Sequence, residues 1–208
     1  MSLLAKTLLG TAALAATAAA ADAPSLPLST SGRWILDAGG ARVKLRCINW
    51  AGHMEAHIPE GLHKQPVETI AGAIADQGFN CVRLTYSIDH ALAPDLKVGD
   101  AFAAVADAAG ISKDDADGLY GNVTEKNAFV AEGGDGGGGA TTSDVYAAVI
   151  KALWDRGVMT ILDNHVSKAS WCCGSSPSPL SLCSFFFSEK GVGDSYSLSP
   201  PPFTPSYS

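Results

Sequence analysis

The sequence lacks any excess of basic residues. Its 208 residues include 14 Lys and Arg against 21 Asp and Glu, which gives a formal net charge of −7. Nucleic acids and anionic membranes attract proteins through clustered positive charge, so this balance argues against either one as a partner. A hydrophobic fraction of 47% with 17% charged residues is ordinary for a globular protein and argues against wholesale disorder.

Several catalytic and metal-binding motifs are also missing. No G-x-S-x-G elbow is present, which disfavours a Ser-His-Asp hydrolase of the α/β type. The adjacent Cys172 and Cys173 lack the C-x-x-C spacing of a zinc ribbon. Glu55 lies between His53 and His57, one place later than the glutamate of a metalloprotease helix. We therefore interpret this segment as a polar loop that lies above a pocket. We therefore expect neither a metal nor a cofactor.

A Gly-rich run at 134–139 satisfies G-x-G-x-x-G literally. The dinucleotide fingerprint needs a strand immediately before it and an acidic residue at the end of the next strand. No convincing strand precedes this run, so we interpret it as a flexible loop.

The N-terminus has the pattern of a secretory signal peptide. Lys6 supplies a short basic region, an Ala-rich apolar run follows from Thr7 to Ala21, and small residues allow cleavage after Ala20 or Ala23. This run is short for a membrane span, and no later segment is long enough to cross a bilayer. We expect residues 1–23 to be removed and the protein to be secreted to the extracellular space without a membrane anchor.

Secretion makes disulfides permissible for the five cysteines, and their odd number leaves at least one unpaired within a monomer. At least one of Cys172 and Cys173 is expected to reach another part of the fold. The sequon at Asn122-Val123-Thr124 fits the same compartment and predicts a glycosylated, exposed loop.

The first structured part is predicted after a Pro/Ser-rich linker at 24–32. Residues 34–37 and 43–49 are predicted to form a hairpin with Gly39 and Gly40 at the turn. The second strand of this hairpin ends in Asn49 and Trp50.

Two later segments repeat one pattern. A helix is predicted over 66–77, ended by Gly78, with a strand over 79–84. A second helix, capped by Thr142 or Ser143, ends at Gly157 and precedes a strand over 158–162. Alternation of this kind predicts right-handed crossovers and a parallel sheet.

A long excursion at 87–141 separates the two units. Only 102–106 is predicted to be helical within it, and loops of this length are usually functional or disordered. From Ser175 onward the chain is rich in Ser, Pro and Phe without periodicity, and no packed element is predicted there.

Polar and aromatic residues follow or end the three predicted strands. Because active sites of β/α barrels lie at the carboxyl ends of the strands, we expect these residues to line a polar cleft. They are Asn49, Trp50, Arg83, Tyr86, Asn164, His165 and Trp171. Arg and His supply charge and donors, and Trp faces can stack on sugars. More ordinary roles are an ion pair for Arg83 and a buried hydrogen bond for His165.

Three phrases of the sequence resemble secreted fungal cellulase-like enzymes of glycoside hydrolase family 5. They are LRCINWAGHME at 45–55, VRLTYS at 82–87, and LDNHVSK at 162–168 followed by Trp171-Cys172-Cys173. The resemblance runs from about residue 28 to Gly174 in the right order. Cys47 departs from it, because the family usually has Gly there, and we expect this change to affect packing more than chemistry.

The resemblance implies a (β/α)8 TIM barrel that hydrolyses β-linked glucans or related polysaccharides with retention. It also implies a supporting role for Arg83 beside the nucleophile and a cleft-lining role for His165. The family uses one glutamate after the fourth strand as acid/base and one on the seventh strand as nucleophile, at a separation of about 5 to 5.5 Å.

Residues 33–174 correspond to only about three barrel strands, and a whole barrel needs around 250 residues. Both catalytic glutamate segments are therefore expected to be absent, and the chain is predicted to be inactive. The tail at 175–208 has the bias of translated non-coding sequence, so we interpret it as a retained intron or the product of a mispredicted splice site, and we expect it to be disordered if it is made. A complete enzyme of this kind is expected to be monomeric. The alternative is a non-catalytic carbohydrate-binding or decoy protein that uses Trp50 and Trp171 as a stacking platform.

Overall fold

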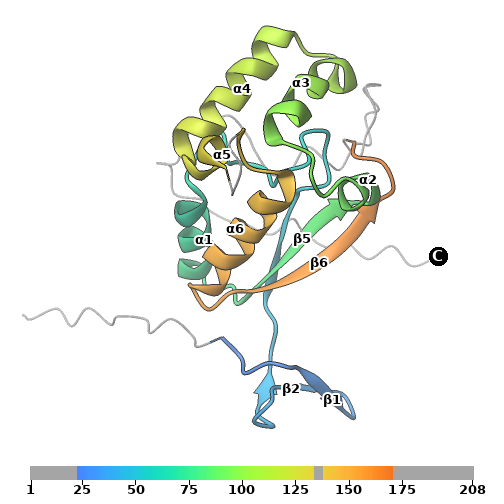
Figure 1. Ribbon diagram of the computed structural model, residues 1–208. Coiled ribbons are helices and arrows are strands. Elements are labelled where there is room, and N and C mark those ends of the chain that lie inside the picture. The colour runs from blue at the N-terminus through green and yellow to red at the C-terminus, as the bar shows by residue number, and fades with distance from the viewer. Residues whose placement is uncertain (1–22, 134–137, 171–208) are drawn as a thin grey trace, which may run out of the picture. The chain divides into compact units, whose positions relative to one another are not determined.

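The computed structural model describes residues 23–133 and 138–170. The predicted signal peptide falls almost wholly outside these ranges, as do most of the Gly-rich run, Trp171 with its neighbouring cysteines, and the Ser/Pro/Phe-rich tail. The part described contains one small antiparallel sheet, one parallel sheet and six helices (Figure 1).

The antiparallel sheet comprises β1 (Ser29–Ser31), β2 (Trp34–Leu36) and β3 (Arg42–Val43), in that order. The predicted hairpin is confirmed, with Gly40 at φ 80° in the turn and the Asp37 carboxylate accepting from the Ala41 N–H at 2.8 Å. Two boundaries were wrong. The predicted linker contains β1, and the predicted strand at 43–49 is divided between the hairpin and the parallel sheet.

The parallel sheet comprises β4 (Cys47–Trp50), β5 (Cys81–Ser87) and β6 (Met159–Val166), with β5 in the centre. Its register pairs Asn49 with Arg83 and Thr85 with Asp163. The predicted parallel arrangement is therefore confirmed. The strand predicted to end at residue 162 instead continues to Val166, because Asp163 and Asn164 keep pairing with β5 and, after a register shift that passes over His165, Val166 pairs with Ser87.

Helices α1 (Val67–Asp76) and α6 (Thr142–Trp154) pack together beside the parallel sheet (Figure 1). Val82 and Leu84 of β5 are fully buried in the hydrophobic core that these helices share. Full burial of one such side chain contributes about 1.5 to 3 kcal/mol. This face of the sheet is thus committed to the core, which leaves the opposite face for polar side chains.

The ends of these two helices follow from their sequences. Gly78 adopts φ 81° just after α1, as its predicted role at the helix end requires. The residue that caps α6 is Thr141, not Thr142 or Ser143, because the Thr141 hydroxyl accepts from the Asp144 N–H at 3.0 Å. The Asp144 carboxylate accepts from the Thr141 N–H in return, at 2.8 Å, which completes a capping box.

The excursion after β5 is helical over most of its described length. It contains α2 (Ile88–Leu92), α3 (Val98–Ala109), α4 (Lys113–Lys126) and α5 (Phe129–Glu132). Buried Val98, Phe102 and Val123 attach it to the main core. The expectation of a long loop with one short helix was wrong, because α4 is mostly polar and its few apolar contacts lie far apart in sequence.

Asn122 lies exposed on α4, so the predicted exposure of the sequon is confirmed and its predicted loop conformation is wrong. A different asparagine joins this excursion to the rest of the fold. Asn127 is buried, and its side-chain oxygen accepts from the Val67 N–H at the start of α1 at 2.9 Å. Its amide nitrogen donates to the Leu62 carbonyl at 2.8 Å. No helix within 23–133 or 138–170 is both long and apolar enough to cross a bilayer.

Candidate functional site

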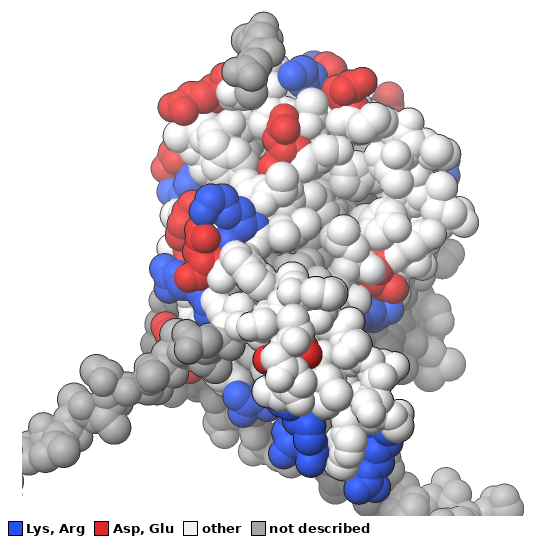
Figure 2. Space-filling model, turned by 60° about the horizontal axis from the view of Figure 1, so that its bottom comes forward, with Lys and Arg blue, Asp and Glu red and all other residues white. Residues whose placement is uncertain are grey.

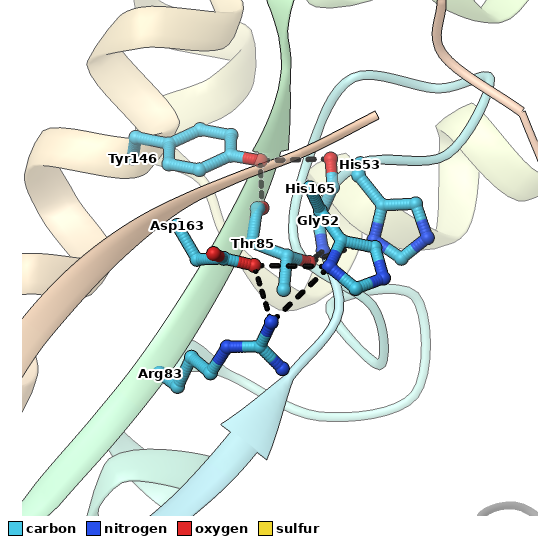
Figure 3. Close-up of polar contacts among 7 residues, drawn as sticks. All are labelled: Gly52, His53, Arg83, Thr85, Tyr146, Asp163 and His165. Atoms are coloured by element: carbon cyan, nitrogen blue, oxygen red, sulfur yellow. Dashed lines mark hydrogen bonds and ion pairs between the residues drawn. The ribbon is translucent and has the colours of Figure 1, made fainter. Parts of the chain in front are cut away.

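The open face of the parallel sheet carries an ion pair between the neighbouring strands β5 and β6. Arg83 lies in the first half of β5 and not at its carboxyl end as predicted, because β5 continues to Ser87. Arg83 Nη2 lies 2.8 Å from Asp163 Oδ2, and the two side chains are 41% and 25% exposed (Figure 3). Arg83 and Thr85 alternate with the buried Val82 and Leu84 along β5, so both point away from the helices. The strand period therefore determines which polar side chains meet.

His165 joins this ion pair. Its Nδ1 atom lies 2.9 Å from Asp163 Oδ2 and 3.3 Å from Arg83 Nη2. A guanidinium can only donate, so the two contacts require opposite states of Nδ1. The shorter contact to a carboxylate favours Nδ1–H donating to Asp163. This tautomer leaves Nε2 as an acceptor for a ligand hydroxyl.

A second histidine stacks on the first. The ring centroids of His53 and His165 are 4.5 Å apart, and His53 is only 8% exposed. Its Nδ1 lies 2.7 Å from Thr85 Oγ1, which also accepts from the Gly52 N–H at 3.1 Å. Because Oγ1 already accepts from Gly52, its own proton is free to be donated to His53. Burial, and next the nearby His165, lower the pKa of His53, so the ring is kept neutral.

Tyr146 of α6 fixes the loop that carries His53. Its hydroxyl oxygen lies 2.7 Å from the Gly52 carbonyl and 2.8 Å from the Thr85 carbonyl, so its one proton is shared between two acceptors (Figure 3). Burial raises the pKa of Tyr146, which keeps this donor protonated. A Cβ on Gly52 would lie 2.8 Å from the Thr85 carbonyl oxygen, so the close approach requires glycine.

A further pair of histidines, His57 and His90, lies next to Tyr146. His57 and His90 face each other edge to face at 6.0 Å, and His90 is 4.6 Å from the Tyr146 ring. Asp89 accepts from the His90 N–H and from the Ala169 N–H, both at 2.9 Å. Burial lowers the pKa of both histidines, and His57 lowers that of His90 further. Among the described residues, no cluster of three His, Cys, Asp or Glu is placed to hold a metal ion.

The residues predicted to line the cleft divide between the two faces of the sheet. Asn49 is exposed and lies in register with Arg83. His165 contacts Arg83 on the same face. Strand alternation turns Tyr86 and Asn164, which are in register with each other, to the opposite face. Tyr86 packs against the core there. Trp171 lies outside the described residues.

Trp50 does not offer the stacking face expected of it. It is 7% exposed, belongs to the core, and donates its indole N–H to the Glu60 carbonyl at 2.8 Å. The prediction considered position at a strand end but not the alternation that points Trp50 toward the helices.

Four contributing residues were missed: His53, Thr85, Tyr146 and Asp163. Thr85 and Asp163 could have been predicted from strand alternation, because each lies two residues from Arg83 or His165 on the same strand and therefore points to the same face. Only the fold brings Tyr146 to Gly52, 94 residues earlier in the chain.

Comparison with known proteins relates the chain to a family. No protein-family profile matches the chain. A protein from Chamaecyparis obtusa described as a "Glycosyl hydrolase 5 family protein" is 44% identical over 159 residues, covering 74% of this chain. Over these residues the chain resembles glycoside hydrolase family 5, and we call them the family 5 segment. The family 5 segment spans only 26% of that relative's length.

One solved structure supports the fold of this part of the chain. The catalytic domain of the major endoglucanase from Xanthomonas campestris pv. campestris matches with a TM-score of 0.50 and 21% identity. The match covers 70% of this chain and 34% of the endoglucanase. An endocellulase from Pyrococcus horikoshii in complex with cellotetraose matches 66% of this chain and 30% of its own, with 20% identity and a TM-score of 0.46.

Proposed function

We propose that the family 5 segment forms the first three strands of a (β/α)8 barrel. The parallel order of β4, β5 and β6, with α1 and α6 on one face, supports this assignment. The polar face would then line the barrel interior, and the ends of β5 and β6 would lie at the catalytic face.

We further propose that this face binds β-linked polysaccharide of the cellulose or β-glucan type. The observation that carries the proposal is the partly exposed cluster of Arg83, Asp163 and His165 on the open face of the sheet. The Asp163 carboxylate fixes the guanidinium and the imidazole, so donors and an acceptor are oriented before a sugar arrives. Such preorganisation reduces the cost of ordering side chains on binding.

Hydrolysis with retention would need two further carboxyl groups, about 5 to 5.5 Å apart. Asp163 is a poor candidate for either, because one of its oxygens already accepts from both Arg83 and His165. We propose that a polypeptide with the remaining strands supplies the pair. A chain of these 208 residues would then bind glucan without cleaving it. The Cys47–Cys81 disulfide supports a secreted protein, because such bonds persist in oxidising compartments.

The test is the binding of cellotetraose to the purified 208-residue protein by calorimetry. We expect binding that weakens at least about tenfold, roughly 1.4 kcal/mol, in Arg83→Ala and in His165→Ala. Lys151→Ala, at an exposed position of α6, is the matched control and should bind like the parent protein. Circular dichroism and thermal melting would establish that each variant is folded. Equal binding by all four proteins would place the sugar elsewhere.

A further inference from the structure

The small antiparallel sheet carries a concentration of positive charge. Arg33 and Arg42 are exposed on this sheet, and Lys44 and Arg46 are exposed in the segment that leads from it to β4. Residues 23–46 contain these four cations and a single acid, Asp37, for a net charge of +3 in a chain of net charge −7. The rest of the chain therefore carries −10. Figure 2, which turns this end toward the viewer, shows Lys and Arg side chains gathered along its lower edge.

The arginines are ordered by a tryptophan. The Arg42 guanidinium carbon lies 3.3 Å from the centre of the Trp34 ring, and that of Arg33 lies 4.4 Å from it. A guanidinium stacked on indole keeps its edge N–H groups free to donate. Within the described residues, none of the four cations forms an ion pair with an Asp or Glu. The donors are thus both oriented and unneutralised.

This surface is distinct from the candidate site. The Arg46 N–H donates to the Asn80 side chain at 2.7 Å, and Asn80 immediately precedes β5. The small antiparallel sheet therefore lies at the amino ends of the parallel strands (Figure 1). His165, in contrast, lies toward the carboxyl end of β6.

We propose that this cationic sheet is a binding surface for an acidic polysaccharide, a polymer whose sugar rings bear carboxylates. Arginine binds carboxylates through paired N–H donors, and the exposed Ile35 offers apolar area to a sugar ring. The resemblance to a glycoside hydrolase family favours a glycan over other polyanions. This binding does not depend on the glucan site.

The experiment measures binding of the 208-residue protein to polygalacturonate at 50 and 200 mM NaCl. Neutral β-glucan, duplex DNA and phosphatidylserine vesicles serve as comparison ligands. We expect binding to polygalacturonate that weakens roughly tenfold with the added salt, because the contact is ionic. Tighter binding to DNA or to vesicles would overturn the proposal and assign the surface to that class of partner.

The variant pair is Arg33→Ala with Arg42→Ala, against Lys113→Ala with Lys151→Ala. Both doubles remove two positive charges, but the second removes them from exposed positions on α4 and α6. We expect at least a tenfold loss for the arginine double and less than twofold for the lysine double. Arg42→Lys, which keeps the charge and loses the planar fork, should weaken binding severalfold. Equal losses in the two doubles would reduce the effect to net charge and overturn the proposal. Arg83→Ala should leave this binding unchanged, which separates it from the glucan site.

Discussion

At the scale of single residues, Thr85 of β5 holds the loop that carries Gly52 and His53. Its hydroxyl is buried, accepts from Gly52 and contacts His53. Thr85→Val keeps the shape and removes the hydroxyl, which leaves two buried polar partners unsatisfied. We expect the free energy of unfolding to fall by about 1 to 3 kcal/mol.

Urea denaturation measures that loss, and Thr85→Ser is the matched control because it restores the hydroxyl. Nitrogen NMR shifts of the His53 ring would report the bond directly, since the variant removes the donor to Nδ1. A valine variant with unchanged stability and unchanged ring shifts would contradict the assigned bond.

The buried histidines make stability depend on pH. Burial lowers the pKa of His53, His57 and His90 below the unfolded value of about 6.5, so the folded state prefers the neutral rings. Their contribution is complete above about pH 6.5 and is lost as pH falls through that value toward the folded pKa. A difference of one pKa unit between the two states is worth about 1.4 kcal/mol.

We expect the free energy of unfolding, measured in urea at pH 7.5, 6.5 and 5.5, to decrease toward the acidic end. His90→Phe should flatten the decrease, because phenylalanine keeps an aromatic ring beside Tyr146 and cannot be protonated. A steeper decrease in this variant would show that His90 does not penalise protonation.

Part of this site could be predicted from residues alone. Arg83 and His165 follow from their position near the ends of the predicted strands, and the fold confirms that their side chains meet, although β5 itself continues beyond Arg83 to Ser87. Trp50 and Tyr86 were assigned to the same cleft because strand ends were considered without strand parity. His53 could not be placed, because an irregular loop has no period that reveals its direction.

At the scale of elements, a disulfide joins two strands of the parallel sheet. Cys47 of β4 and Cys81 of β5 are directly in register and bonded across 34 residues of chain. Closing a loop of this length in the unfolded state is worth roughly 3 to 4 kcal/mol on the chain-entropy estimate. We expect the double variant Cys47→Ser with Cys81→Ser to lose stability of that order.

Urea denaturation with and without a thiol reductant provides the measurement. The parent protein should lose stability on reduction, whereas the double serine variant should respond little. An equal response of both proteins would assign the effect to the other cysteines.

The sequence predicted α1, α6 and the parallel strands well, because each has an apolar period and clear terminal residues. The excursion between β5 and α6 escaped prediction for the opposite reason. The polar α4 is held by Asn127 and a few separated apolar contacts, which no local pattern reveals. Cross-strand pairing of Cys47 with Cys81 likewise requires the register, which sequence reasoning had not fixed.

At the scale of the whole molecule, the family 5 segment covers about a quarter of its curated relative, 26% by length. We expect the purified 208-residue protein to release no reducing sugar from β-glucan, because hydrolysis with retention needs a carboxyl pair that we assign to later strands. A reducing-sugar assay, with a complete endoglucanase as positive control, measures this. Release above the buffer background would contradict the assignment. Sequencing the transcript across the Gly174 codon would show whether a longer reading frame exists.

The hydrogen bond from the Tyr146 hydroxyl to the Gly52 carbonyl also has a consequence for the order of folding. It joins residues separated by 94 positions, and contacts of such range form slowly because a long loop must close first. The loop that carries His53 is made early during synthesis but gains this anchor only when α6 docks. The loop that carries His53 is therefore fixed late in folding. In a nascent chain halted before α6, His53 would not yet be held in place.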